Sequence, residues 1–430
     1  MPAVIAAVIF VSGYAAIASE RFDRVKIVLG GAGLLLALQI IDLEDAAHST
    51  EYGVDWNVIF LLLGMMVIVA GVQRTGLFDY LALHAVRRAG GRPFRLMILL
   101  VVLTAVASAL VDNVTTVLLV APMVLSLTRE LGLNPVPYLL SIVFASNIGG
   151  TATLIGDPPN IIIGSTANLT YVDFLVHLTP LVILLIVVFV GLCRVMFRGS
   201  FQVDPGRAAA VQAIDPRERI TDHRMLAWSL AVLAAVTVLF ALHGVVDYEP
   251  GVVAILGAGV MMIVAASPGD LLDEVEWPTL AFFIGLFIMV GALVKVGIVE
   301  SIAERFADLI DGRLLMGCLL LLVVSAVLSA IVDNIPYVAT MTPIVATIVA
   351  GLPAGTDGDP LWWSLALGAD LGGNATPVGA SANLIVLAIA ARNGYTISFG
   401  RFVKYGLVVS VVTIGVSALY VYLRYFVIAG

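Results

Sequence analysis

Long apolar segments separated by polar loops run along the whole 430-residue chain. An apolar stretch of about 20 residues can cross the hydrocarbon core of a bilayer as a helix. By length and apolarity we expect ten crossing segments, which predicts an all-α polytopic membrane protein. The expected segments cover residues 3–19, 26–41, 57–73, 135–167, 175–196, 225–242, 251–266, 278–295, 362–391 and 405–428.

Two further apolar stretches, residues 96–128 and 314–350, are too long for one crossing, and an Asp-Asn pair interrupts each. The pairs are Asp112 with Asn113 and Asp333 with Asn334. A carboxylate at mid-bilayer costs about 2.5–3.5 kcal/mol even on mild scales, whereas two short helices meeting at a polar tip place it in a cavity. We therefore predict two re-entrant helical hairpins. The alternative is structural: both residue types are strong N-caps, and Thr115 could assist the first of them.

Two of the ten crossings carry a glycine-rich, polar interruption. Residues 145–164 read ASNIGGTATLIGDPPNIIIG, and residues 368–387 read GADLGGNATPVGASANLIVL. Glycine weakens a helix interior, and the prolines in both stretches remove backbone donors, so we expect two broken helices. Unwound backbone at membrane depth persists only where protein or a cavity satisfies it, and paired breaks indicate a transporter binding site. The alternative for the glycine pairs is close helix packing.

The two halves of the chain repeat each other. A shift of 221 residues aligns Trp56 with Trp277, Gly64 with Gly285, Ser108 with Ser329, Asp112 with Asp333 and Asn113 with Asn334. A shift of 223 residues aligns Gly149, Gly150, Thr153, Gly156 and Asn160 with Gly372, Gly373, Thr376, Gly379 and Asn383. Each half has five crossings, an odd number, so the second copy begins on the opposite side of the membrane and lies upside down relative to the first. This predicts an inverted-topology repeat. We expect a first repeat over residues 1–196, a cytoplasmic linker over 197–224 and a second repeat over 225–430.

The distribution of charged residues predicts which loops face the cytoplasm. Hydrophobic residues make up 61% of the chain and charged residues 12%, and no basic cluster suggests nucleic acid. The loops on one expected face hold 18 of the 22 lysines and arginines. The positive-inside rule makes that face cytoplasmic, so we expect a protein of the cell membrane with both termini outside. Amphipathic stretches at 77–90 and 298–311 predict one interfacial helix on each face, or else surface helices that cover a neighbour.

Four carboxylates, Asp112, Asp157, Asp333 and Asp370, fall in or beside the expected cavity. The four segments that form it contain no lysine or arginine once the loop ends are excluded. Ionised carboxylates there need a cation, a proton or donated hydrogen bonds, so we expect Na+ or H+ as coupling ion, with Na+ possible near the two Asp-Asn tips. No cofactor is expected. The spanning segments lack HExxH, GxSxG and Ser-His pairing, which argues against an enzyme.

The stretches SALVDNVTTVLLVAPM, ASNIGGTATLIGDPPNIIIGS, SAIVDNIPYVATMTPIV and LGGNATPVGASANLIV carry a family resemblance. They resemble the ion transporter superfamily, which contains arsenite permeases, NhaD-type sodium/proton antiporters, dicarboxylate and citrate carriers and the melanosomal P protein. The resemblance implies a scaffold with a mobile transport domain, commonly paired as a homodimer. The resemblance implies that the substrate and ion sites are formed by Asp112, Asn113, Asn147, Gly149, Gly150, Asp157, Asn160, Asp333, Asn334, Asp370, Gly372, Gly373, Asn374, Thr376 and Asn383. We add the neighbouring Thr115 and Thr151 as candidate site residues.

The expected function is secondary transport of a small inorganic solute, coupled to H+ or Na+. Dicarboxylate carriers that resemble this chain have neutral Ser-Asn-Thr tips. Asp112 and Asp333 replace the serine here, which disfavours a dianion. Arsenite or antimonite export is therefore the favoured reading, because arsenite is an uncharged triol that Asn, Thr and Asp groups could hold. A Na+/H+ antiporter is the rival, and a sodium-coupled carboxylate or anion carrier is a further alternative. A channel would differ in needing no ion gradient.

Overall fold

A computed structural model describes residues 1–19, 21–201, 219–242, 248–310 and 312–428, and over these ranges the secondary structure is helical with no strand. The predicted all-α fold is confirmed, including both hairpins and both broken crossings. The helices of the first half are α1 (Pro2–Ala18), α2 (Arg24–Ala37), α3 (Leu43–His48), α4 (Trp56–Arg74), α5 (Leu77–Ala89), α6 (Pro93–Leu110), α7 (Asn113–Glu130), α8 (Pro135–Gly150), α9 (Pro158–Ala167), α10 (Tyr171–His177) and α11 (Thr179–Met196), followed by the 3-10 turn η1 (Arg198–Ser200).

The second half repeats this order, except that no helix of the described chain corresponds to α10. Its helices are α13 (His223–Ala241), α15 (Pro250–Val264), α16 (Pro268–Asp273), α17 (Trp277–Lys295), α18 (Ile298–Ile310), α19 (Leu314–Ile331), α20 (Asn334–Ala350), α21 (Asp359–Gly372), α22 (Ser381–Arg392) and α23 (Phe399–Tyr422), with a π-helical end η3 (Leu423–Ile428). Helices α6 and α7 form the first hairpin, α19 and α20 the second. Helices α8 and α9 form the first broken crossing, α21 and α22 the second.

Helix length and outward apolar side chains fit a protein embedded in lipid. Seven helices in the described chain have at least 18 residues and enough apolar character to cross a membrane; α1, α8, α15, α20 and α22 are shorter. Large apolar side chains stand exposed on these helices, such as Ile183 and Val187 on α11 and Ile263 on α15. In water such a surface would drive aggregation, whereas lipid tails cover it at no cost.

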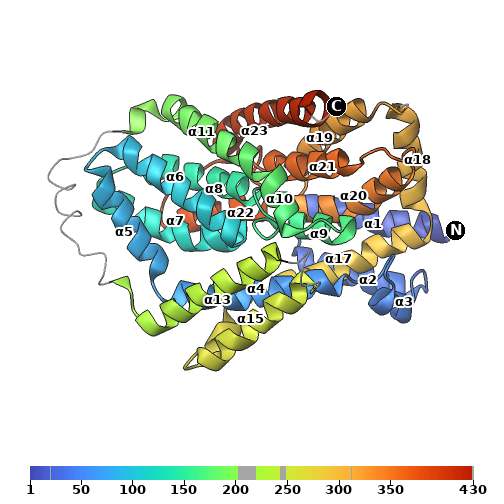
Figure 1. The fold of residues 1–430 in the computed structure, drawn as a ribbon, viewed down its shortest axis with the longest axis horizontal. Helices are drawn as coiled ribbons and strands as arrows, with labels where there is room; N and C mark the ends of the chain where they lie inside the picture. Colours follow the sequence, from blue (N-terminus) through green and yellow to red (C-terminus); the bar gives the residue numbers. More distant parts are fainter. Residues whose placement is uncertain (20, 202–218, 243–247, 311, 429–430) are drawn as a thin grey trace.

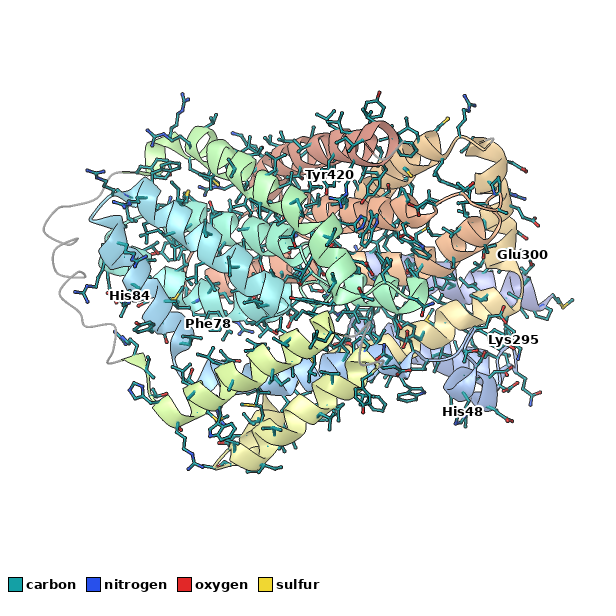
Figure 2. The ribbon with its side chains drawn as sticks, viewed as in Figure 1. His48, Phe78, His84, Lys295, Glu300 and Tyr420 are labelled. Atoms are coloured by element: carbon teal, nitrogen blue, oxygen red, sulfur yellow. The ribbon has the colours of Figure 1, made fainter. Side chains whose placement is uncertain are left out.

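The two amphipathic helices lie at opposite ends of the molecule. Figure 1 shows α5 at one end of the longest axis and α18 at the other, and Figure 2 marks these ends with His84 on α5 and Glu300 on α18. The two helices occupy equivalent positions in the repeat. Their separation is therefore what an inverted repeat requires, since the second copy is upside down relative to the first.

The hairpins turn where the Asp-Asn pairs interrupt the apolar run. In the first hairpin, Val111 and Asp112 have extended backbone between α6 and α7, and Asp112 is the N-cap of α7. Val332 and Asp333 repeat this between α19 and α20. An N-cap residue needs non-helical backbone and a side-chain acceptor, so an aspartate in the middle of an apolar run ends one helix and starts the next.

Most of the predicted linker lies outside the described residues, because residues 202–218 fall there. Its last part is attached to the end of α4. The Thr221 amide donates to the Thr75 carbonyl at 3.1 Å, and the Thr221 hydroxyl donates to the Arg74 carbonyl at 2.9 Å. The three-part division into residues 1–196, 197–224 and 225–430 stays a prediction.

Close glycine contacts hold each broken crossing against its hairpin. A Cβ atom added to Gly149 on α8 would lie 2.3 Å from the Ala105 carbonyl oxygen of α6. One added to Gly372 on α21 would lie 2.5 Å from the Ala326 carbonyl oxygen of α19. Ala105 and Ala326 are repeat partners, so the same contact is built twice. Small residues at helix crossings allow this approach of two backbones.

Gly149→Ala is expected to lower the free energy of unfolding by about 1–3 kcal/mol, the usual cost of overpacking a filled contact. The measurement is thermal unfolding of the detergent-solubilised protein. Gly415→Ala on α23 is the control, because nothing lies within 4 Å of the Cβ position there. Alanine suits a helix better than glycine by up to about 1 kcal/mol, so the control should be neutral or stabilised. Equal losses in both variants would contradict the close-contact explanation.

Candidate functional site

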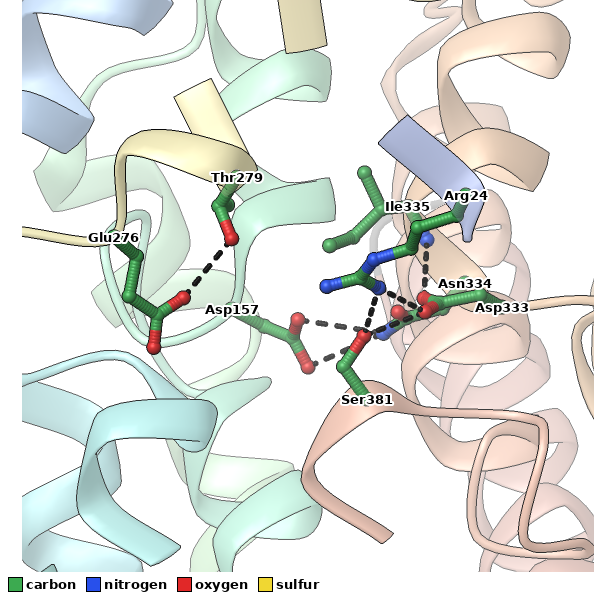
Figure 3. A network of polar contacts seen from close by, with 8 residues as sticks. All are labelled: Arg24, Asp157, Glu276, Thr279, Asp333, Asn334, Ile335 and Ser381. Carbon is green, nitrogen blue, oxygen red and sulfur yellow. Dashed lines mark hydrogen bonds and ion pairs between the residues drawn. The ribbon is translucent and has the colours of Figure 1, made fainter. Parts of the chain in front are cut away.

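The tips of both hairpins meet at one carboxylate, Asp157, in the first break. Residues 151–157 leave the helical path between α8 and α9, and Asp157 is completely buried there. The Asn113 side-chain amide donates to Asp157 Oδ2 at 2.8 Å. The Asn334 amide donates to Oδ1 at 3.3 Å and to Oδ2 at 3.4 Å (Figure 3). The inverted repeat thus brings two tips from distant parts of the chain onto a single acid.

Asn147 joins both breaks to this centre. Its side-chain oxygen Oδ1 accepts a hydrogen bond from the Asn113 side-chain amide at 3.2 Å. Its own amide donates to Asn374 Oδ1 at 3.0 Å and to Asn383 Oδ1 at 3.1 Å, both in the second broken crossing. All of these side chains are buried. One buried network of amides therefore connects the four segments in which sequence analysis placed the site.

Several candidate residues shape the breaks themselves. The Asn160 amide donates to the Thr153 carbonyl at 3.0 Å, and the Asn383 amide donates to the carbonyls of Gly373 and Thr376, both at 2.8 Å. These donors replace the helical hydrogen bonds that unwinding removes, which a buried backbone requires. The Thr376 hydroxyl donates to the Ala330 carbonyl and ties the second break to its hairpin.

Asn383→Leu is expected to destabilise the second break by about 1–3 kcal/mol, because the buried carbonyl of Gly373 and the part-buried carbonyl of Thr376 lose their donor. Hydrogen exchange of the backbone amides in residues 373–380 should become faster in this variant. Asn393→Leu is the control. The Asn393 amide also donates to a carbonyl, that of Ile389, but it is exposed, so its loss should change stability by less than about 0.5 kcal/mol. Unchanged exchange in the Asn383 variant would show that the break holds without this amide.

The glycine pairs bring backbone segments together. A Cβ atom on Gly150 would lie 2.5 Å from the Gly156 carbonyl oxygen, and one on Gly373 would lie 2.8 Å from that of Gly379. The packing interpretation of these glycines therefore matches the geometry. The Thr151 hydroxyl donates to the Asn147 carbonyl at 2.9 Å, at the end of α8.

The two tip aspartates have different surroundings. Asp112 accepts hydrogen bonds from the Thr115 amide at 2.8 Å and the Thr115 hydroxyl at 2.6 Å, so it caps its own helix. Asp333 accepts from the Ile335 amide at 3.3 Å, and its Oδ2 atom also accepts from the Ser381 hydroxyl at 2.5 Å. The N-cap interpretation thus describes both aspartates, and the asparagines beside them are the residues that face Asp157.

Arg24, the first residue of α2, reaches the second tip and was missed by sequence reasoning. Its guanidinium Nη1 lies 2.9 Å from Asp333 Oδ2 and 2.5 Å from the Ser381 hydroxyl oxygen (Figure 3). In the sequence, this arginine is only one of the 18 basic residues on the expected cytoplasmic face. Glu276, at the N-cap position of α17, is drawn in the same view and accepts from the Thr279 hydroxyl at 2.9 Å. No sequence signal distinguished either residue from ordinary loop charges.

Several buried oxygen atoms in this region accept no hydrogen bond from the described residues. They are both carboxylate oxygens of Asp370 and the side-chain carbonyl oxygens of Asn113 and Asn160. Asp370 lies beside Thr151 and Asn160, so the second crossing turns its acid toward the first break. Asp370 and Asn160 are completely buried. Leaving such acceptors unsatisfied costs about 1–3 kcal/mol each, and more for a charged group.

A large cavity of about 980 Å³ lies next to the network. Leu154 and Ile161 of the first broken crossing form part of its wall, together with α20, α17 and the loop before α4. None of the candidate site residues lines it. Its acidic side chains are Glu51, Asp55 and Glu249, and the Ser165 hydroxyl donates to Asp55 Oδ2 at 2.5 Å. The cavity therefore borders the first broken crossing, but Asp157 is not among the residues that line it.

Known proteins resemble the chain over nearly its full length. The sequence profile of the citrate transporter family CitMHS matches residues 14–368. A protein of Mycobacterium tuberculosis described as an uncharacterized transporter is 49% identical over 99% of both chains. The human P protein is 32% identical over 99% of this chain and 60% of its own length. The YdaH transporter of Alcanivorax borkumensis, whose crystal structure is described as having an unusual topology, shares the fold with a TM-score of 0.57 at 15% identity, over 94% of this chain and 97% of that one.

Proposed function

The chain belongs to the citrate transporter (CitMHS) family of the ion transporter superfamily, and from this premise we propose that it is a secondary active transporter driven by Na+ or H+. Family membership confirms the resemblance in the sequence and makes the chain an integral membrane transporter. The observation that carries the coupling proposal is Asp157, a completely buried acid that both hairpin tips contact and to which, among the described residues, only side-chain amides donate. A buried carboxylate without a cationic partner favours binding of a cation or a proton.

We assign the coupling ion to Asp157 rather than to the two tip aspartates. Asp112 is engaged by Thr115, and Asp333 by Arg24 and Ser381. Na+ is a hard cation that prefers oxygen ligands, as Ca2+ and Mg2+ do. The Asn113 side-chain oxygen accepts no hydrogen bond from the described residues, while the amide group of the same side chain donates to Asp157. A proton on Asp157 would satisfy the same charge requirement, so both coupling ions fit these surroundings.

For the solute, we propose arsenite or antimonite, moved outward against its gradient. The network around Asn147, Asn374 and Asn383 consists of amide donors and acceptors, which suit the hydroxyl groups of an uncharged trihydroxy species. A dicarboxylate would meet Asp157 and Asp370 at the same centre, and like charges at short range cost several kcal/mol. The charge of the site therefore favours a neutral or cationic solute.

A second candidate, Na+/H+ antiport, is favoured by a separate observation. Asp370 and Asn160 contribute three buried oxygen atoms that accept no hydrogen bond from the described residues. Together with Asp157 they offer two acids on opposite broken crossings. Two acids suffice for exchange of Na+ against H+ without any other solute, as each ion would neutralise the same carboxylates in turn.

Transport by the purified protein in liposomes tests the proposal. Arsenite, antimonite, Na+ and a dicarboxylate are offered separately, with imposed pH and Na+ gradients. We expect arsenite or antimonite movement that stops when both gradients are collapsed. Gradient-driven Na+ movement without any effect of arsenite would select the antiporter. Solute flux that ignores both gradients would contradict secondary active transport and indicate a channel.

A further inference from the structure

Arg24 connects three separate elements through one charged group. It begins α2, where Asp23 caps the helix by accepting from the Val25 and Lys26 amides. Its guanidinium donates to Asp333 at the second hairpin tip and to Ser381 at the start of α22. The group also lies over the Phe282 ring of α17, 5.3 Å from the ring centre. Its side chain is 35% exposed, whereas the Asp333 side chain is 9% exposed.

The inverted repeat has no equivalent of this arginine in its other half. Helix α2 packs on α17 with Val28 against Gly285, and α15 packs on α4 with Ala254 against Gly64. Because Gly64 and Gly285 are repeat partners, Val28 corresponds to Ala254, a shift of 226 residues. The same shift places Pro250 where Arg24 would be.

The two acid tips therefore differ in charge. Asp333 carries an ion pair with a nitrogen-to-oxygen distance of 2.9 Å. No ion pair reaches Asp112 from the part of the chain that the structure describes, and its hydrogen bonds come from Thr115 in its own helix. A symmetric transporter would offer two equivalent acids to a coupling ion. Here Arg24, which is covalently part of the chain, already neutralises Asp333.

We propose that Arg24 is a tethered cation that occupies the second tip in place of a coupling ion and so fixes the number of cations moved per cycle. This inference rests on the proposed cation coupling. Arginine is charged at every physiological pH, so Asp333 stays neutralised while the pair persists. A mobile cation at Asp333 would have to compete with a guanidinium held within hydrogen-bonding distance. Asp157, which has no basic partner among the described residues, remains for the coupling ion.

Arg24→Gln is expected to release Asp333 for a mobile cation. The number of coupling cations per solute, taken from the reversal potential in proteoliposomes, should rise by about one, since one fixed charge is removed. The dependence of transport on the coupling-ion concentration should also become steeper. Arg24→Lys should keep the wild-type ratio, because an ammonium group can pair with the same carboxylate. Arg74→Gln is the matched control: Arg74 pairs with Asp270 at 2.7 Å on an exposed surface, and its loss should leave the ratio unchanged.

The double variant Arg24→Gln with Asp333→Asn separates charge from folding. It removes both members of the pair and should restore the wild-type ratio. A folded Arg24→Gln protein with the wild-type ratio would overturn the proposal. If Arg24→Gln is inactive, recovery of activity at the wild-type ratio in the double variant supports it, and a folded but equally inactive double variant overturns it. If transport by the wild-type protein does not depend on a Na+ or pH gradient, the proposed cation coupling itself is wrong.

Discussion

Asp157→Asn is expected to reduce gradient-driven transport about 100-fold or more while the protein remains folded and inserted. Asparagine keeps the size of the side chain but removes the charge that binds the coupling ion. Charge-assisted contacts contribute about 1.5–3 kcal/mol each, and about 1.4 kcal/mol corresponds to a factor of ten. Losing two such contacts is therefore enough for the expected effect. The measurement is initial uptake into liposomes under the gradient that drives the wild-type protein.

Asp112→Asn is the matched control for this variant. Asp112 caps α7 through Thr115, and asparagine is about as good an N-cap as aspartate. Transport by this variant should stay within about tenfold of wild type, because asparagine retains the cap and Asp112 is not assigned to the coupling ion. Comparable transport by Asp157→Asn and the wild type would remove the central role of Asp157. Equal losses in the two variants would show that the tip and the break act as one acid cluster.

Asp370→Asn is expected to change stability and cation response in opposite directions. Neither carboxylate oxygen of Asp370 accepts a hydrogen bond from the described residues, although the side chain is completely buried. Removing a buried charge that has no basic partner among the described residues should stabilise the cation-free protein by about 1–3 kcal/mol. A cation at 100 times its dissociation constant stabilises by about 2.7 kcal/mol, and this gain should disappear in the variant.

Thermal unfolding in sodium and in choline chloride, each at several pH values, measures both effects. We expect a higher midpoint for Asp370→Asn in choline and a smaller shift on adding sodium or acid. Asp222→Asn, an exposed N-cap at α13, serves as the control and should leave both quantities unchanged. A lower midpoint in choline with the full response to sodium and acid would contradict a cation-binding role for Asp370.

The fold was predictable where the chemistry of one or two residues decides the local path. An Asp-Asn pair inside an apolar run ends one helix and caps the next, so the hairpins follow from the sequence. Glycine pairs followed by prolines likewise predict the breaks in α8–α9 and α21–α22. The repeat could be read from the spacing of Asp112 and Asp333. These signals are local, and each is compatible with a single backbone conformation of low free energy.

The arrangement of the site was less accessible. From the sequence alone, the four acids are expected to lie together and the two tips to be equivalent. At a capped turn, neighbouring side chains point to different sides, so Asp112 faces its own helix while Asn113 faces Asp157. Arg24 enters from an element outside the four expected segments, and no spacing rule links it to Asp333. Asp157 aligns with Ala380 in the second repeat, so the centre of the network breaks the symmetry that revealed the fold.

The most direct test of the account is the current that follows a rapid Na+ or pH jump across a supported layer of proteoliposomes without solute. If Asp157 holds the coupling ion at the meeting point of both hairpins, the wild-type protein should give a transient current for at least one of the two jumps. The current should persist in Asp112→Asn and vanish in Asp157→Asn. A current in Asp157→Asn as large as that of the wild-type protein would contradict the assignment of the coupling ion to Asp157.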